Sequence, residues 1–332
     1  MRRKTIRTII VTGGTGFIGS HTVEQLLAEG FHVRCLIRPH QINLRWLQDL
    51  PVDLVEGDLL NSTSISKCIE DAEYIIHIAG ITKAKHKSEF FTGNVTTTNN
   101  LLLAASQLKH LKKFCYISSL TAVGPSSTGI ALTETSHCHP ITTYGKSKLE
   151  AEHLCKHYSE KLPIVIIRPP AVFGPRDTDI LELFKWVSHG FKPVLGSSSK
   201  TLSLVYAPDL AKGIICATLN DRTIGETYNI ADPTIFTFSS IIDYLATFIN
   251  KRTIQVHLPK GVVYSMAGIA QFIAFLSKRP AVLNIEKARD LLQTHWVCDP
   301  RKIQEHIGFQ TSTSIYDGVN KTFRWYKEKR WL

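Results

Sequence analysis

A glycine-rich turn directly after a short apolar run constrains the fold of this chain more than any other feature. The sequence IIVTGGTGFIGS spaces three glycines three residues apart, ahead of a predicted helix over 17–29. Glycines there let backbone N–H groups approach a pyrophosphate, and the positive end of the helix dipole favours the anion. The turn therefore predicts a dinucleotide site. Its expected residues are Gly13, Thr15, Gly16, Phe17, Ile18 and Gly19.

Apolar runs and helical segments alternate after this turn. We expect strands in TIRTIIV, FHVRCLI, VDLVE, EYIIHIA, KKFCYISS and PIVIIRP, with helices near 17–29, 62–71 and 95–109. Continuous apolar strands separated by helices indicate a parallel sheet covered on both faces. The pattern predicts an α/β, Rossmann-like, doubly wound sheet with a smaller C-terminal substrate-binding portion. We assign 1–168 to dinucleotide binding and 169–332 mainly to substrate binding, with about 202–232 returning to the first domain.

A second motif, YGKSK, opens a predicted helix about 130 residues beyond the glycine turn. Tyr144 and Lys148 are four residues apart, so their side chains share one helix face. A nearby ammonium favours phenolate and would lower the tyrosine pKa, which is ordinarily near 10. Upstream, the strand FCYISS ends in hydroxyls at the sheet edge where ligands bind, so Ser119 is a candidate to polarise a substrate oxygen. Ser118 and Thr121 are weaker candidates for this role.

Together these motifs resemble the extended short-chain dehydrogenase/reductase family, also called the NAD-dependent epimerase/dehydratase family. The glycine spacing is GxxGxxG, and the segments Asn94-Val95, 168–175 and 206–211 are similar to further family motifs. The resemblance covers essentially the whole chain. It implies an NAD(P)-dependent oxidoreductase in which Ser119, Tyr144 and Lys148 are catalytic, with Tyr144 as general acid and base. It also implies that Asp209 caps a helix.

The resemblance also implies where the cofactor binds. Arg38, at the end of the second predicted strand, stands where an acidic residue would bind the NAD ribose, and an arginine there favours the 2′-phosphate of NADP. We therefore expect NADP, with NAD as the alternative and stacking of Arg38 on adenine as its other possible role. The remaining expected cofactor contacts are Asp58, Leu59, Ala79, Gly80, Tyr144, Lys148, Pro169 and Val172.

Substrate class is less constrained. Epimerases and dehydratases of this family commonly carry an arginine before the segment like 206–211, but the sequence here is KTLSLVY over 200–206. An apolar alcohol or ketone, as in members that resemble dihydroflavonol reductases and 3β-hydroxysteroid dehydrogenases, is therefore the leading expectation. The runner-up is a nucleotide-sugar 4-epimerase with tightly bound NAD. A non-enzymatic NADP-binding sensor is a third hypothesis, which an intact catalytic set argues against.

One long apolar stretch, VVYSMAGIAQFIAFL over 262–276, has no counterpart among these motifs. At 15 residues it is too short to span a membrane, and we expect a buried structural helix. The alternatives are the wall of an apolar substrate pocket and a helix lying on a membrane surface.

Composition and charge limit which other ligands and partners we expect. The 332 residues carry a net charge of +11, but the basic residues are spread without interleaved aromatics, so we expect no nucleic-acid partner. The seven cysteines lack a CxxC pair, and His137-Cys138-His139 lacks a second ligand pair, so we expect neither a disulfide framework nor a metal. We further expect no spanning segment, no signal peptide and a cytoplasmic location, and allow for a homodimer.

Overall fold

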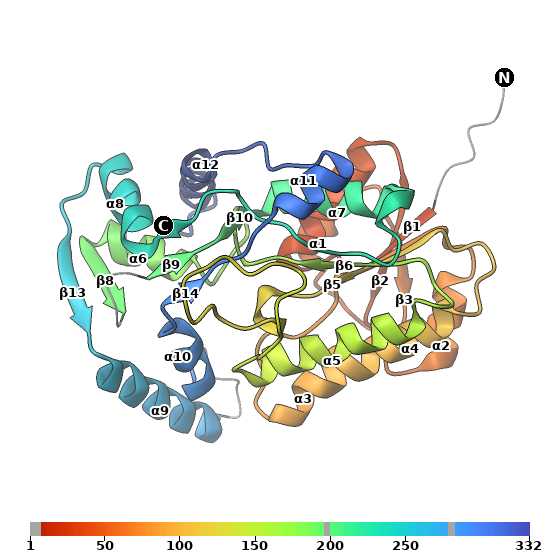
Figure 1. The fold of residues 1–332 in the computed structure, drawn as a ribbon, viewed down its shortest axis with the longest axis horizontal. Helices are drawn as coiled ribbons and strands as arrows, with labels where there is room; N and C mark the ends of the chain where they lie inside the picture. The colour runs from red at the N-terminus through yellow and green to blue at the C-terminus, as the bar shows by residue number, and fades with distance from the viewer. Residues whose placement is uncertain (1–7, 196–199, 278–282) are drawn as a thin grey trace.

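The computed structural model describes residues 8–195, 200–277 and 283–332, and its centre is a seven-stranded parallel sheet (Figure 1). The strand order is β11-β6-β5-β4-β1-β2-β3. The chain adds β2 and β3 on one side of β1 and then crosses over to add β4, β5 and β6 on the other side, so the topological switch point lies between β1 and β4. This confirms the Rossmann-like doubly wound fold and a strand in each of the six predicted segments, although residues 5–7 of the first segment, TIRTIIV, lie outside the described residues. An edge strand that was not predicted, β11, completes the sheet. The strands are β1 (Thr8–Thr12), β2 (His32–Ile37), β3 (Asp53–Glu56), β4 (Tyr74–His77), β5 (Lys113–Ile117), β6 (Ile164–Arg168) and β11 (Thr227–Asn229).

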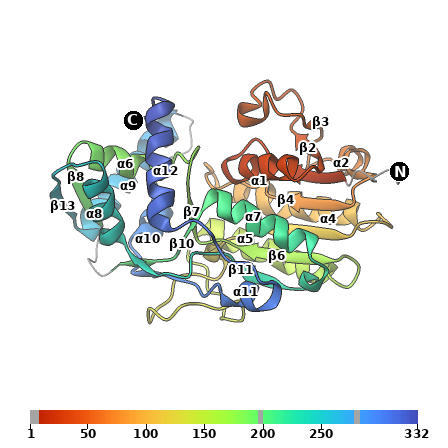
Figure 2. The same cartoon turned by 90° about the horizontal axis from the view of Figure 1, so that it is seen from above.

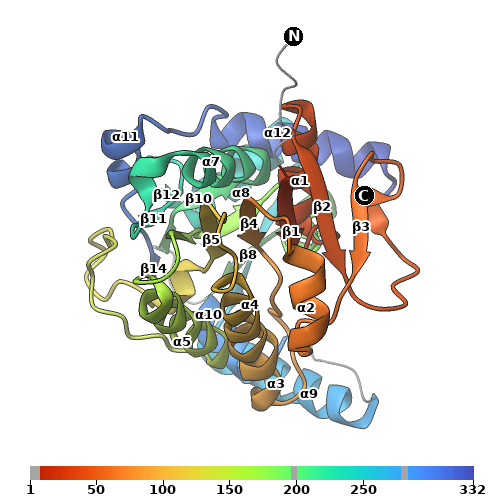
Figure 3. The same cartoon turned by 90° about the vertical axis from the view of Figure 1, so that its right-hand side faces the viewer.

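Helices cover both faces of this sheet, as Figures 1 and 3 show. One face carries α1 (Phe17–Ala28) and α7 (Ala207–Leu219), and the other carries α2 (Ser62–Ile69), α4 (Thr97–Ala105) and α5 (Thr143–Tyr158). The helix predicted over 95–109 in fact starts earlier, because α3 (Lys87–Phe91) continues through a π-helical turn over Thr92–Thr96 into α4, which ends at Ala105. Two apolar clusters, one on each face, fill the space between helices and strands.

The start of α5 is fixed by its own sequence. Thr142 caps the helix, because its hydroxyl accepts a hydrogen bond from the Gly145 N–H at 3.0 Å. A capping hydroxyl satisfies one of the N–H groups that a helix start leaves without a partner. The cap therefore sets where Tyr144 and Lys148 stand relative to the sheet edge.

Most of the remaining elements form a second body beside the sheet, and α12 (Ile315–Glu328) stands at its edge toward the sheet in Figure 2. The short helices over 87–91 and 301–307 pack instead on α5 and β11 of the central body. The strands of the second body form the pairs β7–β10 and β8–β13 and the three-stranded sheet β12–β9–β14. The strands are β7 (Ala171–Phe173), β8 (Phe191–Leu195), β9 (Thr201–Leu202), β10 (Leu204–Tyr206), β12 (Phe236–Thr237), β13 (Ile254–Leu258) and β14 (His295–Trp296). The helices outside the central layers are α3 (Lys87–Phe91), α6 (Leu181–Ser188), α8 (Phe238–Phe248), α9 (Lys260–Ser277), α10 (Ile285–Leu291), α11 (Arg301–Ile307) and α12 (Ile315–Glu328).

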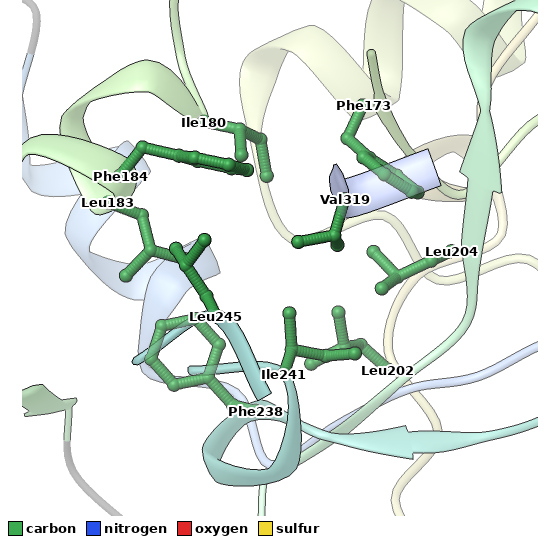
Figure 4. Close-up of a pocket in the computed structure, with 10 residues that line it drawn as sticks. All are labelled: Phe173, Ile180, Leu183, Phe184, Leu202, Leu204, Phe238, Ile241, Leu245 and Val319. Atoms are coloured by element: carbon green, nitrogen blue, oxygen red, sulfur yellow. The ribbon is translucent and has the colours of Figure 1, made fainter. Parts of the chain in front are cut away.

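Apolar side chains from α6, α8 and α12 form the core of this second body and leave a small cavity (Figure 4). Its volume is about 40 Å³, and all ten side chains that line it are apolar. Ligand pockets are typically several hundred Å³, and an apolar void of this size has no polar partner for water. It is therefore a packing gap, and none of the predicted site residues lines it.

Helix α9 contradicts the expectation of a buried helix over 262–274, and the side chains of 275 and 276, the end of that predicted stretch, lie outside the described residues. Val263 and Ala267 pack against α10, but Ile269 is 62% exposed and Phe272 is 64% exposed. The reason is that α10 covers only one narrow stripe of α9. The side chains of Met266 and Ile273 on the same outer face are also exposed.

A second correction concerns Asp209. It lies in the first turn of α7, but it does not cap that helix. Its carboxylate instead accepts a hydrogen bond from the Thr313 N–H at 2.8 Å and others from the hydroxyls of Ser312 and Thr313. Asp209 therefore fastens the segment before α12 to the central body.

Within the described ranges, no helix is both long enough and apolar enough to cross a bilayer.

Candidate active site

The glycine turn between β1 and α1 is too tightly packed for side chains. Gly13 has φ +75°, and a Cβ there would lie 2.7 Å from the Ala79 nitrogen. A Cβ on Gly19 would lie 2.1 Å from the Gly13 carbonyl oxygen, so α1 can begin this close to the turn only with glycine. Gly16 stands just before α1 and donates its N–H to the Gly13 carbonyl at 3.0 Å. The turn thus has the cradle form that suits a pyrophosphate at a helix N-terminus.

A buried histidine that the sequence analysis missed joins this turn to the neighbouring strand. The His77 ring lies 2.7 Å from the Thr12 hydroxyl and 2.9 Å from the Thr98 hydroxyl. Burial, with a smaller contribution from Lys148, lowers the pKa of His77 to about 3, so the ring is neutral. Thr12 also accepts from the Ala79 N–H at 3.2 Å. This chain of hydrogen bonds fixes the ends of β1 and β4, between which the strand order reverses.

The predicted adenosine contacts lie at the ends of β2, β3 and β4. The Arg38 side chain is exposed, and its own N–H contacts Gln41, whose amide donates to the Thr15 hydroxyl at 3.3 Å. The loop that carries Arg38 therefore touches the glycine turn. Asp58 is exposed and accepts from the Leu60 N–H at 2.9 Å, and the carbonyl of Leu59 accepts from α4.

Gly80 brings the end of β4 close to α5. A Cβ on Gly80 would lie 2.8 Å from Asn94 Oδ1 and 3.7 Å from Lys148 Nζ. Asn94 accepts from the Ile81 N–H at 2.8 Å and donates to the Ser147 hydroxyl at 2.9 Å. The expected cofactor segment Ala79-Gly80 is thereby held beside the expected catalytic lysine.

Tyr144 and Ser119 meet at the carboxyl end of β5. The Ser119 hydroxyl lies close enough to the Tyr144 phenol to lower its pKa, and the Ser119 oxygen accepts from the Thr121 hydroxyl at 2.9 Å. Because Thr121 donates to Ser119, the Ser119 proton is available for the phenol or for a substrate oxygen. Ser118 points elsewhere and donates to Glu152 at 2.5 Å, which removes it as a substitute for Ser119.

The expectation that Lys148 lowers the tyrosine pKa is not met. Burial raises the pKa of Tyr144 to about 12, while the hydrogen bond with Ser119 acts to lower it and Asp290 raises it further. The Lys148 ammonium instead donates to the Ile117 carbonyl at 2.6 Å and lies 4.7 Å from the centre of the Tyr116 ring. Burial also lowers the pKa of Lys148 to about 8. Lys148 shares a helix with Tyr144, but its charge is directed to the end of β5.

Glu152, one further turn along α5, forms a buried ion pair that sequence reasoning missed. Its carboxylate contacts Arg168 Nε at 2.9 Å and Nη2 at 2.6 Å, and the two side chains are 0% and 1% exposed. The pair joins α5 to the end of β6. The sequence did carry a signal for this pair: Glu152 follows Lys148 at the same spacing of four residues, and Arg168 ends a predicted strand.

The expected nicotinamide segment follows β6 directly. Pro169 is buried, and its carbonyl accepts from the Leu120 N–H at 2.8 Å, next to Ser119. Val172 lies in β7, opposite Val205 of β10. The segment from Pro169 to Val172 therefore passes the same sheet edge as the catalytic candidates.

Two acidic residues of α10 approach the start of α5 from the second body. Glu286 accepts hydrogen bonds from the Thr143 N–H at 2.8 Å and from its hydroxyl at 2.7 Å. Asp290 is close enough to raise the pKa of Tyr144, and burial raises its own pKa. No local signal marks either residue, because each lies more than 140 positions from the residue that it affects, Thr143 or Tyr144.

A glycine turn that leaves room for a pyrophosphate, on a parallel sheet with this strand order, is typical of the Rossmann-like fold of dinucleotide-binding enzymes. The model of the NAD dependent epimerase/dehydratase family matches residues 9–231. The chain belongs to this family, which confirms the resemblance drawn from the motifs. Its family and relatives are NAD-dependent enzymes, and the chain is an enzyme of this kind.

Individual relatives span several reactions. The chain is 27% identical to a ceramide reductase of Caulobacter vibrioides, over 98% of this chain and 96% of that protein. It is 28% identical to a putative dihydroflavonol 4-reductase of Synechocystis, over 75% of this chain and 76% of that protein. Among solved structures, UDP-glucuronic acid 4-epimerase from Bacillus cereus in complex with NAD is 26% identical, with a TM-score of 0.78, over 97% of this chain and 99% of that one.

Proposed function

We propose that this enzyme interconverts an apolar alcohol and ketone by hydride transfer, with Tyr144 as general acid and base. The observation that carries the proposal is the placement of the Ser119 hydroxyl beside the buried Tyr144 phenol at the carboxyl end of β5. A substrate oxygen placed between these hydroxyls would accept from Ser119 and exchange a proton with the phenol. The pKa near 12 favours the protonated phenol at neutral pH, which is the form that donates during ketone reduction.

The residues present fit a dinucleotide. The glycine cradle, which has no room for a Cβ, suits the pyrophosphate, and Arg38, Asp58, Leu59, Ala79 and Gly80 would flank the adenosine half. Lys148, Pro169 and Val172 would flank the nicotinamide half. When bound, the cofactor supplies or accepts the hydride.

Arg38 supports a preference for NADP. Its guanidinium is exposed at the end of β2, and the same loop touches the glycine turn through Gln41 and Thr15. Within the described ranges, no carboxylate forms an ion pair with Arg38. A free guanidinium there would bind a 2′-phosphate through charge-assisted hydrogen bonds.

The stretch before β10 favours an apolar substrate over a nucleotide sugar. It carries no arginine, and Lys200 is buried and donates to the Leu291 carbonyl at 2.6 Å. Lys200 is therefore occupied inside the protein and is poorly placed to grip a diphosphate. The ceramide reductase and the putative dihydroflavonol reductase are relatives whose names also denote reductases.

Tyr144→Phe tests the proposal. The variant should bind nucleotide normally and lower the turnover of ketone reduction by about 100-fold or more, the scale of general acid loss. We would screen cyclic and long-chain ketones with NADPH and NADH. Tyr158→Phe, at the other end of the same helix, is the matched control and should turn over normally.

Two results would overturn the proposal. One is near-normal turnover of Tyr144→Phe on a ketone that the wild-type enzyme reduces. The other is the absence of ketone reduction together with micromolar binding of uridine or thymidine diphosphate, which would favour the nucleotide-sugar epimerase.

A further inference from the structure

Helix α9 presents an apolar face that no other described part of the chain covers. Five large side chains on it are between 44% and 64% exposed: Val262, Met266, Ile269, Phe272 and Ile273. Four of them recur at steps of four, three and four residues, so they form one continuous stripe. Val263 and Ala267, each one residue on from a member of this stripe and so about 100° further round the helix, pack against α10. A stripe of this size on a protein surface marks an interaction site.

The charge around this stripe selects its partner. The sequence from 251 to 290 contains seven Lys and Arg residues and two acidic residues, Glu286 and Asp290. Lys260 of α9 and Lys287 and Arg289 of α10 are exposed, although Lys287 lies 3.9 Å from Asp290. The Glu286 carboxylate accepts hydrogen bonds from Thr143 and lies 3.6 Å from Lys87. A second copy of this basic surface would repel the first. An anionic lipid surface is complementary to it.

The dimensions of α9 also suit a lipid surface. The helix has 18 residues with no acidic side chain, and it does not qualify as a membrane-spanning helix. A helix with an apolar face and basic surroundings lies in the plane of a bilayer, with that face in the boundary between headgroups and acyl chains.

We propose that α9 docks this enzyme on an anionic lipid bilayer through the stripe of Val262, Met266, Ile269, Phe272 and Ile273. Docking would place the α9–α10 pair against the headgroups. Glu286 of α10 is bonded to Thr143, the neighbour of Tyr144, so the start of α5 lies on the side of the enzyme that meets the bilayer. The proposal goes beyond the chemistry of the active site and does not depend on which ketone is reduced.

Vesicle flotation tests the proposal without any substrate. Wild-type protein should float with vesicles of phosphatidylcholine and phosphatidylglycerol, and less with phosphatidylcholine alone or in high salt. The double variant I269S/F272S should lower the partition coefficient about tenfold or more, because two apolar anchors are lost. Both side chains are mostly exposed, so the fold should persist, as a thermal melt and nucleotide binding would verify.

The matched control is I130S/I224S, which changes two other exposed isoleucines, 72% and 47% exposed, and should float like the wild type. The proposal is overturned if the wild type does not float with anionic vesicles, or if I269S/F272S floats equally well. Sedimentation velocity provides a further check. A wild-type dimer that I269S/F272S converts to monomers would show that a second copy covers α9. Because flotation needs no turnover, its failure is distinct from a failure of the Tyr144→Phe test.

Discussion

Replacing Glu152 with glutamine should destabilise the protein far more than its conservative appearance suggests. The substitution preserves volume but removes the charge that faces Arg168, and an amide N–H₂ would then face guanidinium donors. The remaining partners of Arg168 are the Glu134 backbone carbonyl at 3.1 Å and the Cys138 sulfur at 3.8 Å, and neither replaces the paired carboxylate of Glu152. Ser118 would also lose its charged acceptor.

The burial of the pair sets the magnitude. Both side chains are at most 1% exposed, and breaking a buried pair by neutralising one partner costs about 3–5 kcal/mol of unfolding free energy. Glu182→Gln is the matched control, because Glu182 forms an ion pair with Lys185 at 2.9 Å but is 59% exposed. An exposed pair contributes about 0–1 kcal/mol, so this control should unfold almost like the wild type.

Urea unfolding followed by circular dichroism measures these free energies. The double variant E152Q/R168M removes both charges, so it should be less destabilised than the sum of its single variants by about 1 kcal/mol or more. A loss below about 1 kcal/mol for Glu152→Gln, or strict additivity in the double variant, would refute the argument that a desolvated charge pair holds α5 on β6.

Three further predictions follow from the cofactor cradle and the buried lysine. Arg38→Asp should weaken NADPH binding at least about tenfold more than NADH binding in fluorescence titrations, and equal losses would show that Arg38 does not read the 2′-phosphate. Gly19→Ala should abolish nucleotide binding and lower stability by about 1–3 kcal/mol, because its Cβ would lie 2.1 Å from the Gly13 oxygen. The matched control is Gly268→Ala, whose Cβ would have no atom within 4 Å and which should leave the thermal stability unchanged or raise it. Burial lowers the pKa of Lys148 from 10.5 to about 8. Between pH 8 and pH 10.5 the lysine is therefore protonated in the unfolded chain but neutral in the folded chain. Stability should therefore rise from pH 8 to 10.5 relative to Lys148→Met, by an amount on the order of 3 kcal/mol, and a flat difference would contradict this.

The sequence alone determined the parts of this protein that depend on local pattern. Continuous apolar runs predicted six parallel strands, because strands covered on both faces have no polar side to present. The glycine turn could be predicted from the sequence because its backbone geometry leaves no room for a side chain at Gly13 or Gly19. Tyr144 and Lys148 were readable because spacing along a helix is fixed.

The tertiary structure decided what depends on neighbours that are distant in sequence. Apolar composition made α9 a helix, but only the narrow contact with α10 determined that Ile269 and Phe272 stay exposed. Spacing placed Lys148 on the same helix face as Tyr144, but the Lys148 ammonium donates to the Ile117 carbonyl. The pKa of Tyr144 is therefore raised by burial and not lowered by Lys148. A pKa or an exposed face depends on everything packed around a group, and in a doubly wound sheet those neighbours come from segments that the chain connects only through its fold.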